Sequence, residues 1–161
     1  MQAFIRSASA RDIEAVSRLL GQCWHETHDS IHGADRVAAL TSEWHSPSAL
    51  KASLDRPGSE FLVADTGKTL VGMAYAQQDG KSVMLKQLYI LRQAQGAGLG
   101  TAFLQEIIEC FPEAEKIVLE VDEANESAIG FYMAGGFAIT GKTGGKAGSG
   151  IPALIMEFPI V

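Results

Sequence analysis

The chain of 161 residues is poor in cysteine and lacks any long apolar run, and each shortage excludes a class of protein. Its two cysteines, Cys23 and Cys110, stand in apolar contexts without the spacing of a disulfide framework or a structural metal site. No apolar stretch is long enough to cross a bilayer, and residues 1–6 lack a signal-peptide pattern. We therefore expect a protein of the reducing cytoplasm whose cysteines pack in its core.

Basic residues are also fewer than acidic ones. The chain has 13 Lys and Arg residues and 19 Asp and Glu residues, which gives a net charge of −6 with the histidines neutral. This balance argues against a broad nucleic-acid surface or an anionic membrane surface as partner. An acidic surface suits a cationic acceptor, such as an amine, better than a second polyanion. The length fits one domain over residues 1–161 with a substantial core.

Hydrophobic periodicity predicts a mixture of strands and helices. The expected strands are 4–6, 61–64, 70–78, 83–91, 117–121, 137–140 and 153–158. The expected helices run from a capping-box-like start at 9–12 to about residue 24, over 34–44 and 48–54 with a break at 46–47, over 102–111 and over 125–134. Asp79-Gly80 predicts a tight hairpin, and the helix after 83–91 makes 117–121 parallel to that strand. The glycine-rich segment 141–150 is predicted as a flexible hairpin loop.

Residues 24–32, Trp-His-Glu-Thr-His-Asp-Ser-Ile-His, form the most polar and aromatic patch of the chain. The segment is interpreted as a loop that lines a pocket, with a solvated helix end as the alternative. His25 and His28 are one residue too close for the zinc-binding His-Glu-x-x-His arrangement. His28 and His32 do have four-residue spacing, but the sequence offers no evident third ligand, so we expect no metal site.

Three glycines on alternate positions, Gly96, Gly98 and Gly100, stand between the apolar run 83–91 and the amphipathic run 102–111. Without Cβ atoms on one side of the turn, a ligand can approach the backbone closely. The helix that follows begins with unpaired N–H groups and the positive end of its dipole, which favour an anion such as a phosphate. Glycines that only let a helix pack on a strand are the alternative. The G-x-G-x-G spacing, after four strands, differs from the dinucleotide-binding G-x-G-x-x-G.

Two blocks of the sequence resemble the GNAT superfamily of acyl-CoA-dependent N-acetyltransferases. The family signature Gln/Arg-x-x-Gly-x-Gly/Ala appears as Gln95-Gly96-Ala97-Gly98-Leu99-Gly100, preceded by Leu88-Tyr89-Ile90-Leu91, which looks like the family's fourth strand. The run 121–137, with its Asn, Phe-Tyr and Gly-Phe, looks like the second block. The resemblance covers most of the chain and implies an α/β (α+β) fold. Such a fold has a mixed, mostly antiparallel sheet of about six or seven strands, splayed between the fourth and fifth, with about four flanking helices.

The resemblance also implies residues that bind acetyl-CoA, the expected co-substrate. Main chain of Leu88, Tyr89 and Ile90 would pair with the pantetheine amides, and backbone N–H groups of the glycine turn would hold the pyrophosphate. The turn comprises Gln95, Gly96, Ala97, Gly98, Leu99, Gly100 and Thr101. Asn125 would bind pantetheine or fix the splayed strand, with a plain helix cap as the alternative. Tyr132, two helical turns further along the same face, is the candidate general acid for the leaving thiolate, with core packing as the alternative.

The implied reaction is direct transfer without a covalent enzyme intermediate. A neutral amine attacks the acetyl thioester, whose carbonyl is polarised by a backbone N–H, that of Leu88. Glu120 is the expected catalytic base, with His28, Asp29 and Glu26 as alternatives. The acceptor pocket is expected from residues 24–32, with Trp24, His28 and Asp29 as substrate-binding residues, and from segment 141–150.

The favoured hypothesis is an acetyl-CoA-dependent N-acetyltransferase that acts on a primary amine, of a small molecule rather than of a protein N-terminus or lysine. A catalytically silent acyl-CoA-binding module is the alternative from another class. It would keep the glycine turn but would not need Tyr132. Nucleotide binding at the turn is a third hypothesis. Homodimers are common in the family, and the sequence itself contains no signal for one.

Overall fold

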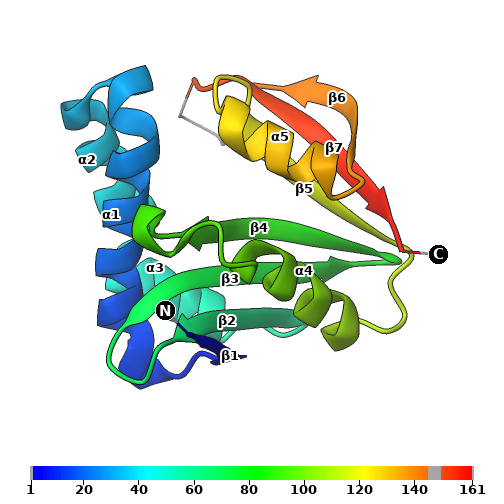
Figure 1. Ribbon diagram of the computed structural model, residues 1–161, viewed down its shortest axis with the longest axis horizontal. Coiled ribbons are helices and arrows are strands. Elements are labelled where there is room, and N and C mark those ends of the chain that lie inside the picture. The colour runs from blue at the N-terminus through cyan, green and yellow to red at the C-terminus, as the bar shows by residue number, and fades with distance from the viewer. Residues whose placement is uncertain (1, 145–149, 161) are drawn as a thin grey trace.

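A computed structural model describes residues 2–144 and 150–160, which form a seven-stranded sheet with flanking helices (Figure 1). In chain order the strands are β1 (Phe4–Ser7), β2 (Ser59–Asp65), β3 (Leu70–Asp79), β4 (Ser82–Ile90), β5 (Lys116–Asp122), β6 (Ala138–Thr143) and β7 (Ala153–Pro159). The helices are η1 (Ala10–Asp12), α1 (Ile13–His32), α2 (Ala34–Trp44), α3 (Pro47–Leu54), η2 (Arg92–Ala94), α4 (Leu99–Cys110) and α5 (Glu126–Ala134), where η marks a short 3-10 helix. The spatial order of the strands is β1-β2-β3-β4-β5-β7-β6.

The sheet divides between its fourth and fifth strands. All neighbouring strands run antiparallel except β4 and β5, which are parallel. These two pair only over Ser82–Leu85 and Lys116–Leu119, although both strands continue beyond the last paired residue. In Figure 1 the gap between them widens toward α1. The mixed, splayed sheet expected from the sequence is therefore confirmed.

A β-bulge lies where the two strands part. The register between β3 and β4 changes from Tyr75 opposite Gln87 to Ala76 opposite Leu85, which leaves Lys86 as an extra residue on β4. Bulges of this kind bend a strand and increase its local twist. Leu85 is also the last residue of β4 that pairs with β5. The bulge therefore turns the end of β4 at the position where its pairing with β5 stops.

The core lies on both faces of the first half of the sheet. Along β3 the residues from Val71 to Ala76 are all buried, which requires cover on both faces. α4 packs on β2, β3 and β4, while α1 contacts β3 and β4 and α3 contacts β2. Figure 1 shows α4 in front of the sheet and α3 behind it. The central strands are thereby held between helices, and β4 is the one that parts from its neighbour β5.

The first helix is longer than the sequence suggested. α1 continues to His32 and ends at Gly33, whose φ is 89°, so the prediction of a loop over residues 24–32 was wrong. Leu20, Trp24 and His28 are buried at four-residue spacing, which continues the apolar face of the helix. The sequence pattern did not show that the helix continues, because Trp24 and His28 have low hydropathy although they are buried. The residues between them are polar.

Other boundaries differ in smaller ways. The break at Ser46-Pro47 separates two helices, so the described residues contain five α-helices rather than about four. α4 begins at Leu99, inside the segment read as the glycine turn. β6 extends through Thr143 into the segment expected to be a loop, of which residues 145–149 lie outside the described part of the chain.

No helix among the described residues has both the length and the apolar character that crossing a membrane requires. Cys23 is buried and Cys110 partly buried, and both are free thiols, as expected for residues that pack in the core. The cytoplasmic location stays a prediction.

Arg6 ties the start of the chain to the sheet. Its guanidinium donates hydrogen bonds to both carboxylate oxygens of Asp12, at 2.8 and 2.9 Å, and to Asp65 at 3.0 Å. The Ser9 N–H donates to Asp12 at 2.8 Å, which is the capping contact expected from the sequence. These bonds, that from Arg6 above all, hold the pKa of Asp12 at about 2, below its ordinary value of 3.8.

We expect Asp12→Asn to lower the free energy of unfolding near neutral pH by about 1–2 kcal/mol, a moderate value because Arg6 stays in contact with water. The folded-state pKa of Asp12 is depressed, so this stabilisation is complete above the unfolded pKa of about 3.9 and is lost as pH falls toward 2. Urea unfolding of the variant and wild type across this pH range measures the effect. The control Asp55→Asn breaks an exposed pair with Lys51 and should cost less than about 0.5 kcal/mol. Equal losses in the two variants would contradict the assignment.

Candidate active site

A cleft of about 770 Å³ opens where β4 and β5 part. It is lined by α1, the end of β4, the glycine turn with the start of α4, and the start of α5. All residues predicted to bind the co-substrate line this cleft except Ala97. They are Leu88, Tyr89, Ile90, Gln95, Gly96, Gly98, Leu99, Gly100, Thr101, Asn125 and Tyr132. The structure thus gathers side chains and backbone from four elements around one opening.

Alternate backbone groups of β4 point into the cleft. The Leu91 N–H donates to the Val71 carbonyl oxygen at 2.9 Å, so this residue bonds toward β3. Because hydrogen-bonding direction alternates along an antiparallel strand, the N–H and C=O groups of Leu88 and Ile90 face away from β3, toward the parted strand β5. Those of Tyr89 face β3. Of the three residues expected to offer main chain to a ligand, two therefore have backbone groups that point away from β3, and the binding role of all three stays a prediction.

The glycine turn combines an open backbone with a packing contact. Gly96 and Gly98 have φ values of 83° and 82°, a conformation that favours glycine, and a Cβ added to either would meet no atom within 4 Å. Gly98 directly precedes α4, whose first N–H groups have no partner within the helix. Gly100 differs, because a Cβ there would lie 2.6 Å from Phe131 Cζ. Of the two interpretations of these glycines, open approach applies to Gly96 and Gly98, and close packing applies to Gly100.

Side chains from the flanking elements hold the turn in place. The Gln95 side-chain amide donates to the Ile90 carbonyl oxygen at 3.1 Å, which ties the turn back to β4. The Arg92 N–H donates to a carboxylate oxygen of Glu26 on α1 at 3.0 Å, and the Arg92 guanidinium donates to the main-chain carbonyl of Glu26. Glu26, one of the alternative bases, is thus engaged in positioning the chain before the turn.

A second, smaller cavity of about 180 Å³ adjoins the cleft. The two share Leu88, Tyr89, Asn125, Ala128 and Tyr132. The remainder of the smaller cavity is aromatic and polar, and its lining includes Trp24, His28, Trp44, Glu120 and Asp122. An elongated ligand in the cleft would therefore present one end to this second chamber.

Tyr132 lies at the junction of the two cavities. Its ring packs edge-on against Phe131 and Phe137, with centroids 5.2 and 5.3 Å away, and the residue is 8% exposed. Burial raises the pKa of Tyr132 well above its usual value, with a smaller contribution from Tyr89, so the phenol keeps its proton at neutral pH. Both packing and a polar role are compatible with this placement.

Asn125 caps α5. Its side-chain oxygen accepts a hydrogen bond from the Ala128 N–H at 3.2 Å, so the capping alternative is observed. The residue also lines both cavities. The capping bond occupies the oxygen, which leaves the NH₂ group as the donor that a ligand would meet.

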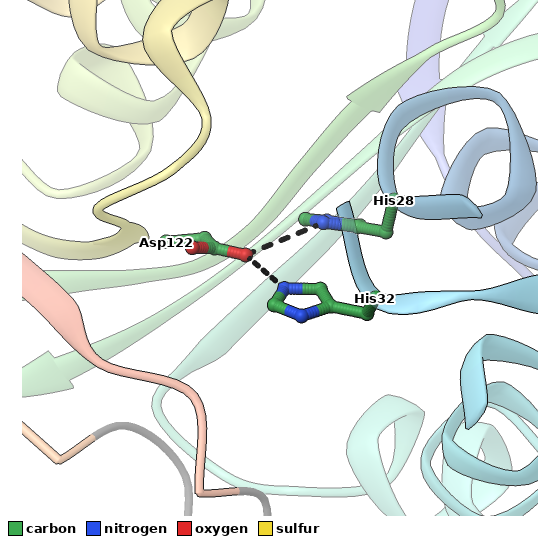
Figure 2. A group of neighbouring side chains, drawn as sticks. All are labelled: His28, His32 and Asp122. Carbon is green, nitrogen blue, oxygen red and sulfur yellow. Dashed lines mark hydrogen bonds and ion pairs between the residues drawn. The ribbon is translucent and has the colours of Figure 1, made fainter. Parts of the chain in front are cut away.

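His28 and His32 from α1 approach Asp122 from the end of β5 (Figure 2). His32 Nε2 lies 2.7 Å and His28 Nδ1 lies 3.4 Å from Asp122 Oδ2. Burial lowers the pKa of His28, an effect that the nearby Asp122 carboxylate partly opposes. The group could not be predicted from the sequence, because Asp122 is remote along the chain and no spacing rule connects a helix to a strand ninety residues later.

Of the remaining predicted residues, some line the smaller cavity and one does not. Trp24 and Glu120 line the smaller cavity, and Trp24 packs against His28 in a tilted arrangement with ring centroids 4.3 Å apart. Glu120 is exposed and has no ion pair within the described residues. Asp29 lies outside the linings of both cavities and pairs instead with His25, at 2.7 Å. Asp29 therefore lies away from the residues of α1 that line the two cavities, and its role in substrate binding stays a prediction.

Comparison with known proteins decides the family. The model of the acetyltransferase (GNAT) domain matches residues 28–158, which include the glycine turn, the split strands and α5. The chain belongs to the GNAT acetyltransferase family. The resemblance noted in the sequence and the expectation of an acyltransferase are thereby confirmed.

Two solved structures share the fold of this GNAT protein over nearly its whole length, and a third shares it over about two thirds. The PaiA N-acetyltransferase of Thermoplasma acidophilum, in complex with coenzyme A, has a TM-score of 0.88 and 22% identity, with 99% of each chain covered. The ribosomal-protein-S18-alanine N-acetyltransferase of Escherichia coli has a TM-score of 0.72 and 19% identity, over 99% of this chain and 94% of that one. A nourseothricin acetyltransferase is 28% identical with a TM-score of 0.58, over 64% of this chain and 66% of that one. The names of these proteins point to different acceptors, so the shared fold does not identify the acceptor of this GNAT protein.

Gly98→Ala tests the open backbone of the turn. We expect it to weaken coenzyme A binding by at least about tenfold, because its methyl group enters the space that a phosphate would occupy. Isothermal titration calorimetry measures the affinity. Gly67→Ala is the matched control, since Gly67 has a φ of 91° and equally open surroundings but lies in the turn between β2 and β3. Both variants should lose about 1–2 kcal/mol of stability, and only Gly98→Ala should lose affinity. If both variants lost affinity, the cause would be backbone strain at a positive φ and not the methyl group at Gly98.

Proposed function

We propose that this GNAT protein transfers the acetyl group of acetyl-CoA directly to a primary amine, favouring an amine of a small molecule. The observation that carries the proposal is that one cleft joins an open glycine turn and outward-facing β4 amides to Tyr132, at the entrance of a separate small cavity. A long, amide-containing ligand with an anionic end fits the cleft. A smaller second substrate fits the cavity.

Acetyl-CoA would be held mainly by backbone. The N–H groups at Gly98 and the start of α4 would bind the pyrophosphate, since partial positive charge gathers at a helix N-terminus. The outward C=O of Leu88 and N–H of Ile90 would pair with the pantetheine amides as an added strand does. The Ile90 carbonyl already accepts a hydrogen bond from Gln95, and the Leu88 N–H is assigned to the thioester oxygen. The solved complex of the Thermoplasma acidophilum relative with coenzyme A supports this assignment at the level of the fold.

Bond formation and bond cleavage would occur at the junction of the two cavities. The nitrogen of a neutral amine attacks the thioester carbonyl, whose oxygen accepts a hydrogen bond from the Leu88 N–H. As the C–N bond forms and the C–S bond breaks, Glu120 takes the ammonium proton through water and Tyr132 donates a proton to the sulfur. The raised pKa of Tyr132 keeps the phenol protonated before transfer. Cys23 lines the cleft, but burial raises the pKa of its thiol to about 12, which argues against a cysteine nucleophile.

The acceptor would occupy the smaller cavity. Trp24 and Trp44 offer aromatic faces, while Glu120 and Asp122 supply negative charge, a combination that suits a cationic amine. A volume of about 180 Å³ favours a small molecule over a folded protein's N-terminus or lysine. The silent acyl-CoA-binding module remains the alternative, and Tyr132 at the junction argues against it.

An amine panel tests the proposed function. Wild-type protein is mixed with acetyl-CoA and individual small amines, polyamines, peptide N-termini and lysine peptides, and free thiol is followed with a colorimetric reagent. We expect thiol release that depends on the amine, with acetylated product confirmed by mass spectrometry. Coenzyme A binding without turnover across the panel would support the silent module. Displacement of coenzyme A by ATP or NAD would support nucleotide binding instead.

Tyr132→Phe should lower kcat by about 10²-fold or more while coenzyme A affinity is largely kept, because the ring remains and only the proton donor is lost. Single-turnover kinetics with the best amine measures the chemical step. Tyr75→Phe is the control, since Tyr75 is also buried and its hydroxyl accepts only from Gln77 within the described residues. Unchanged turnover in Tyr132→Phe would remove Tyr132 from the mechanism.

Glu120→Gln should lower kcat by about 10-fold to 10²-fold at neutral pH, because the variant cannot take the ammonium proton. The loss should shrink as pH approaches the pKa of the amine, where more acceptor is already neutral. The control Glu123→Gln changes an exposed carboxylate three residues further along the chain that lines neither cavity. A pH–rate profile identical to that of the wild type would exclude Glu120 as the base.

A further inference from the structure

Two histidines and one aspartate meet beside the smaller cavity (Figure 2). His28, His32 and Asp122 each offer one ligand atom, and these atoms lie within 4.8 Å of one another. Four-residue spacing on α1 puts both imidazoles on one face of the helix, with ring centroids 5.7 Å apart. Asp122 reaches them from the end of β5. The third ligand that the sequence did not reveal is therefore supplied by the fold.

Hydrogen bonds within the group leave one buried atom unsatisfied. The contact between His32 Nε2 and Asp122 is a normal hydrogen bond. His28 is 3% exposed, and its Nδ1 points toward the same carboxylate oxygen without a hydrogen bond among the described residues. A buried polar atom without a partner costs about 1–3 kcal/mol. A ligand that accepts the Nδ1 lone pair would remove this cost.

We propose that His28, His32 and Asp122 bind one divalent transition-metal ion, with Zn²⁺ as the natural occupant. Two imidazoles and one carboxylate match the ligand preference of Zn²⁺, Co²⁺, Ni²⁺ and Cu²⁺, and they leave further positions on the ion for water or another ligand. Ligand atoms about 2.0–2.1 Å from a tetrahedral zinc ion lie about 3.3 Å from each other. The separations of 2.7 and 3.4 Å from Asp122 Oδ2 bracket that value. The two imidazole nitrogens lie within 4.8 Å of each other, and side-chain rotations that bring them to about 3.3 Å would complete the site.

The surroundings favour a cation and fix its ligands. Asp122 Oδ1 accepts a hydrogen bond from the Ala124 N–H at 2.9 Å, which orients Oδ2 toward the imidazoles as an outer-shell contact does in metal sites. Glu120 adds a second carboxylate to the lining of the cavity. Lys86 also belongs to this lining, but it is exposed and water screens its charge. His28 and Asp122 line the cavity, which gives an ion a path to the site.

Metal binding by tag-free protein, stripped with a chelator, tests the site. Titration calorimetry with Zn²⁺ should give one ion per chain, and Co²⁺ should produce visible absorption typical of nitrogen and oxygen ligation. Mg²⁺ should not bind, because it prefers oxygen ligands in octahedral geometry. Zn²⁺ should raise the melting temperature in a concentration-dependent way, since the unfolded chain lacks the assembled site.

Variants locate the ion. His32→Gln, Asp122→Asn and His28→Gln should each lower Zn²⁺ affinity by at least about tenfold. His25→Gln is the matched control and should keep full affinity, because His25 pairs with Asp29 on the same helix, with both side chains 38% exposed. Where His28→Gln fails to fold, His32→Gln decides, since its imidazole is less buried.

Two results would overturn the proposal: absence of stoichiometric binding by folded wild type, and equal loss of affinity in His25→Gln. The group would then be a His32–Asp122 hydrogen bond with His28 beside it, and no metal ion. Because the readout is binding of the ion, this outcome is independent of whether acetyl transfer is observed.

Discussion

The loss of pairing between β4 and β5 is the constraint on which the rest of the structure depends. Backbone N–H and C=O groups away from bulk water need partners, and beyond Leu85 one side of β4 has no neighbouring strand. The Gln95 side chain satisfies the carbonyl of Ile90, which leaves the outward N–H of Leu88 available to a ligand. The glycine turn follows this strand directly, and α5 begins on the far side of the gap. An interruption in one ladder thus determines where a ligand meets backbone and which helices border it.

α1 forms the wall opposite the divided sheet and borders both cavities. Residues on one side of the helix, including Cys23 and Thr27, line the cleft, while Trp24 and His28 line the smaller cavity. Glu26 joins the helix to the chain before the glycine turn through two bonds to Arg92. The buried face of α1 ends in histidines. The same helix therefore supplies packing for the core and polar groups for the site.

How far the sequence predicted this arrangement depends on how local each signal was. The hairpin between β3 and β4, the glycine turn and the parallel strand after α4 were predicted correctly, because turn chemistry and chain direction are local signals. The loop of the hairpin is Gly80-Lys81, one residue beyond the predicted Asp79-Gly80, since Asp79 still pairs with Ser82. The length of α1 was not, since buried Trp24 and His28 resemble a polar loop when only hydropathy is counted. Asp29 was assigned to the pocket from its position in a polar segment, and the helical turn directs it elsewhere. Asp122 was inside a recognised block, but its contact with α1 depends on tertiary structure alone.

The shared wall between the two cavities has a consequence for how this protein acquires new substrates. Trp24, Glu26 and His28 lie within about one turn of a single helix, which is about 5.4 Å of rise. A substitution at Trp24 or His28 that reshapes the smaller cavity is therefore made on the same helix that holds the chain before the glycine turn through Arg92. Under the proposed function, changes of α1 residues in the smaller cavity should come with compensating changes near Arg92 and the glycine turn, so that such proteins would diversify by paired substitutions rather than by single ones.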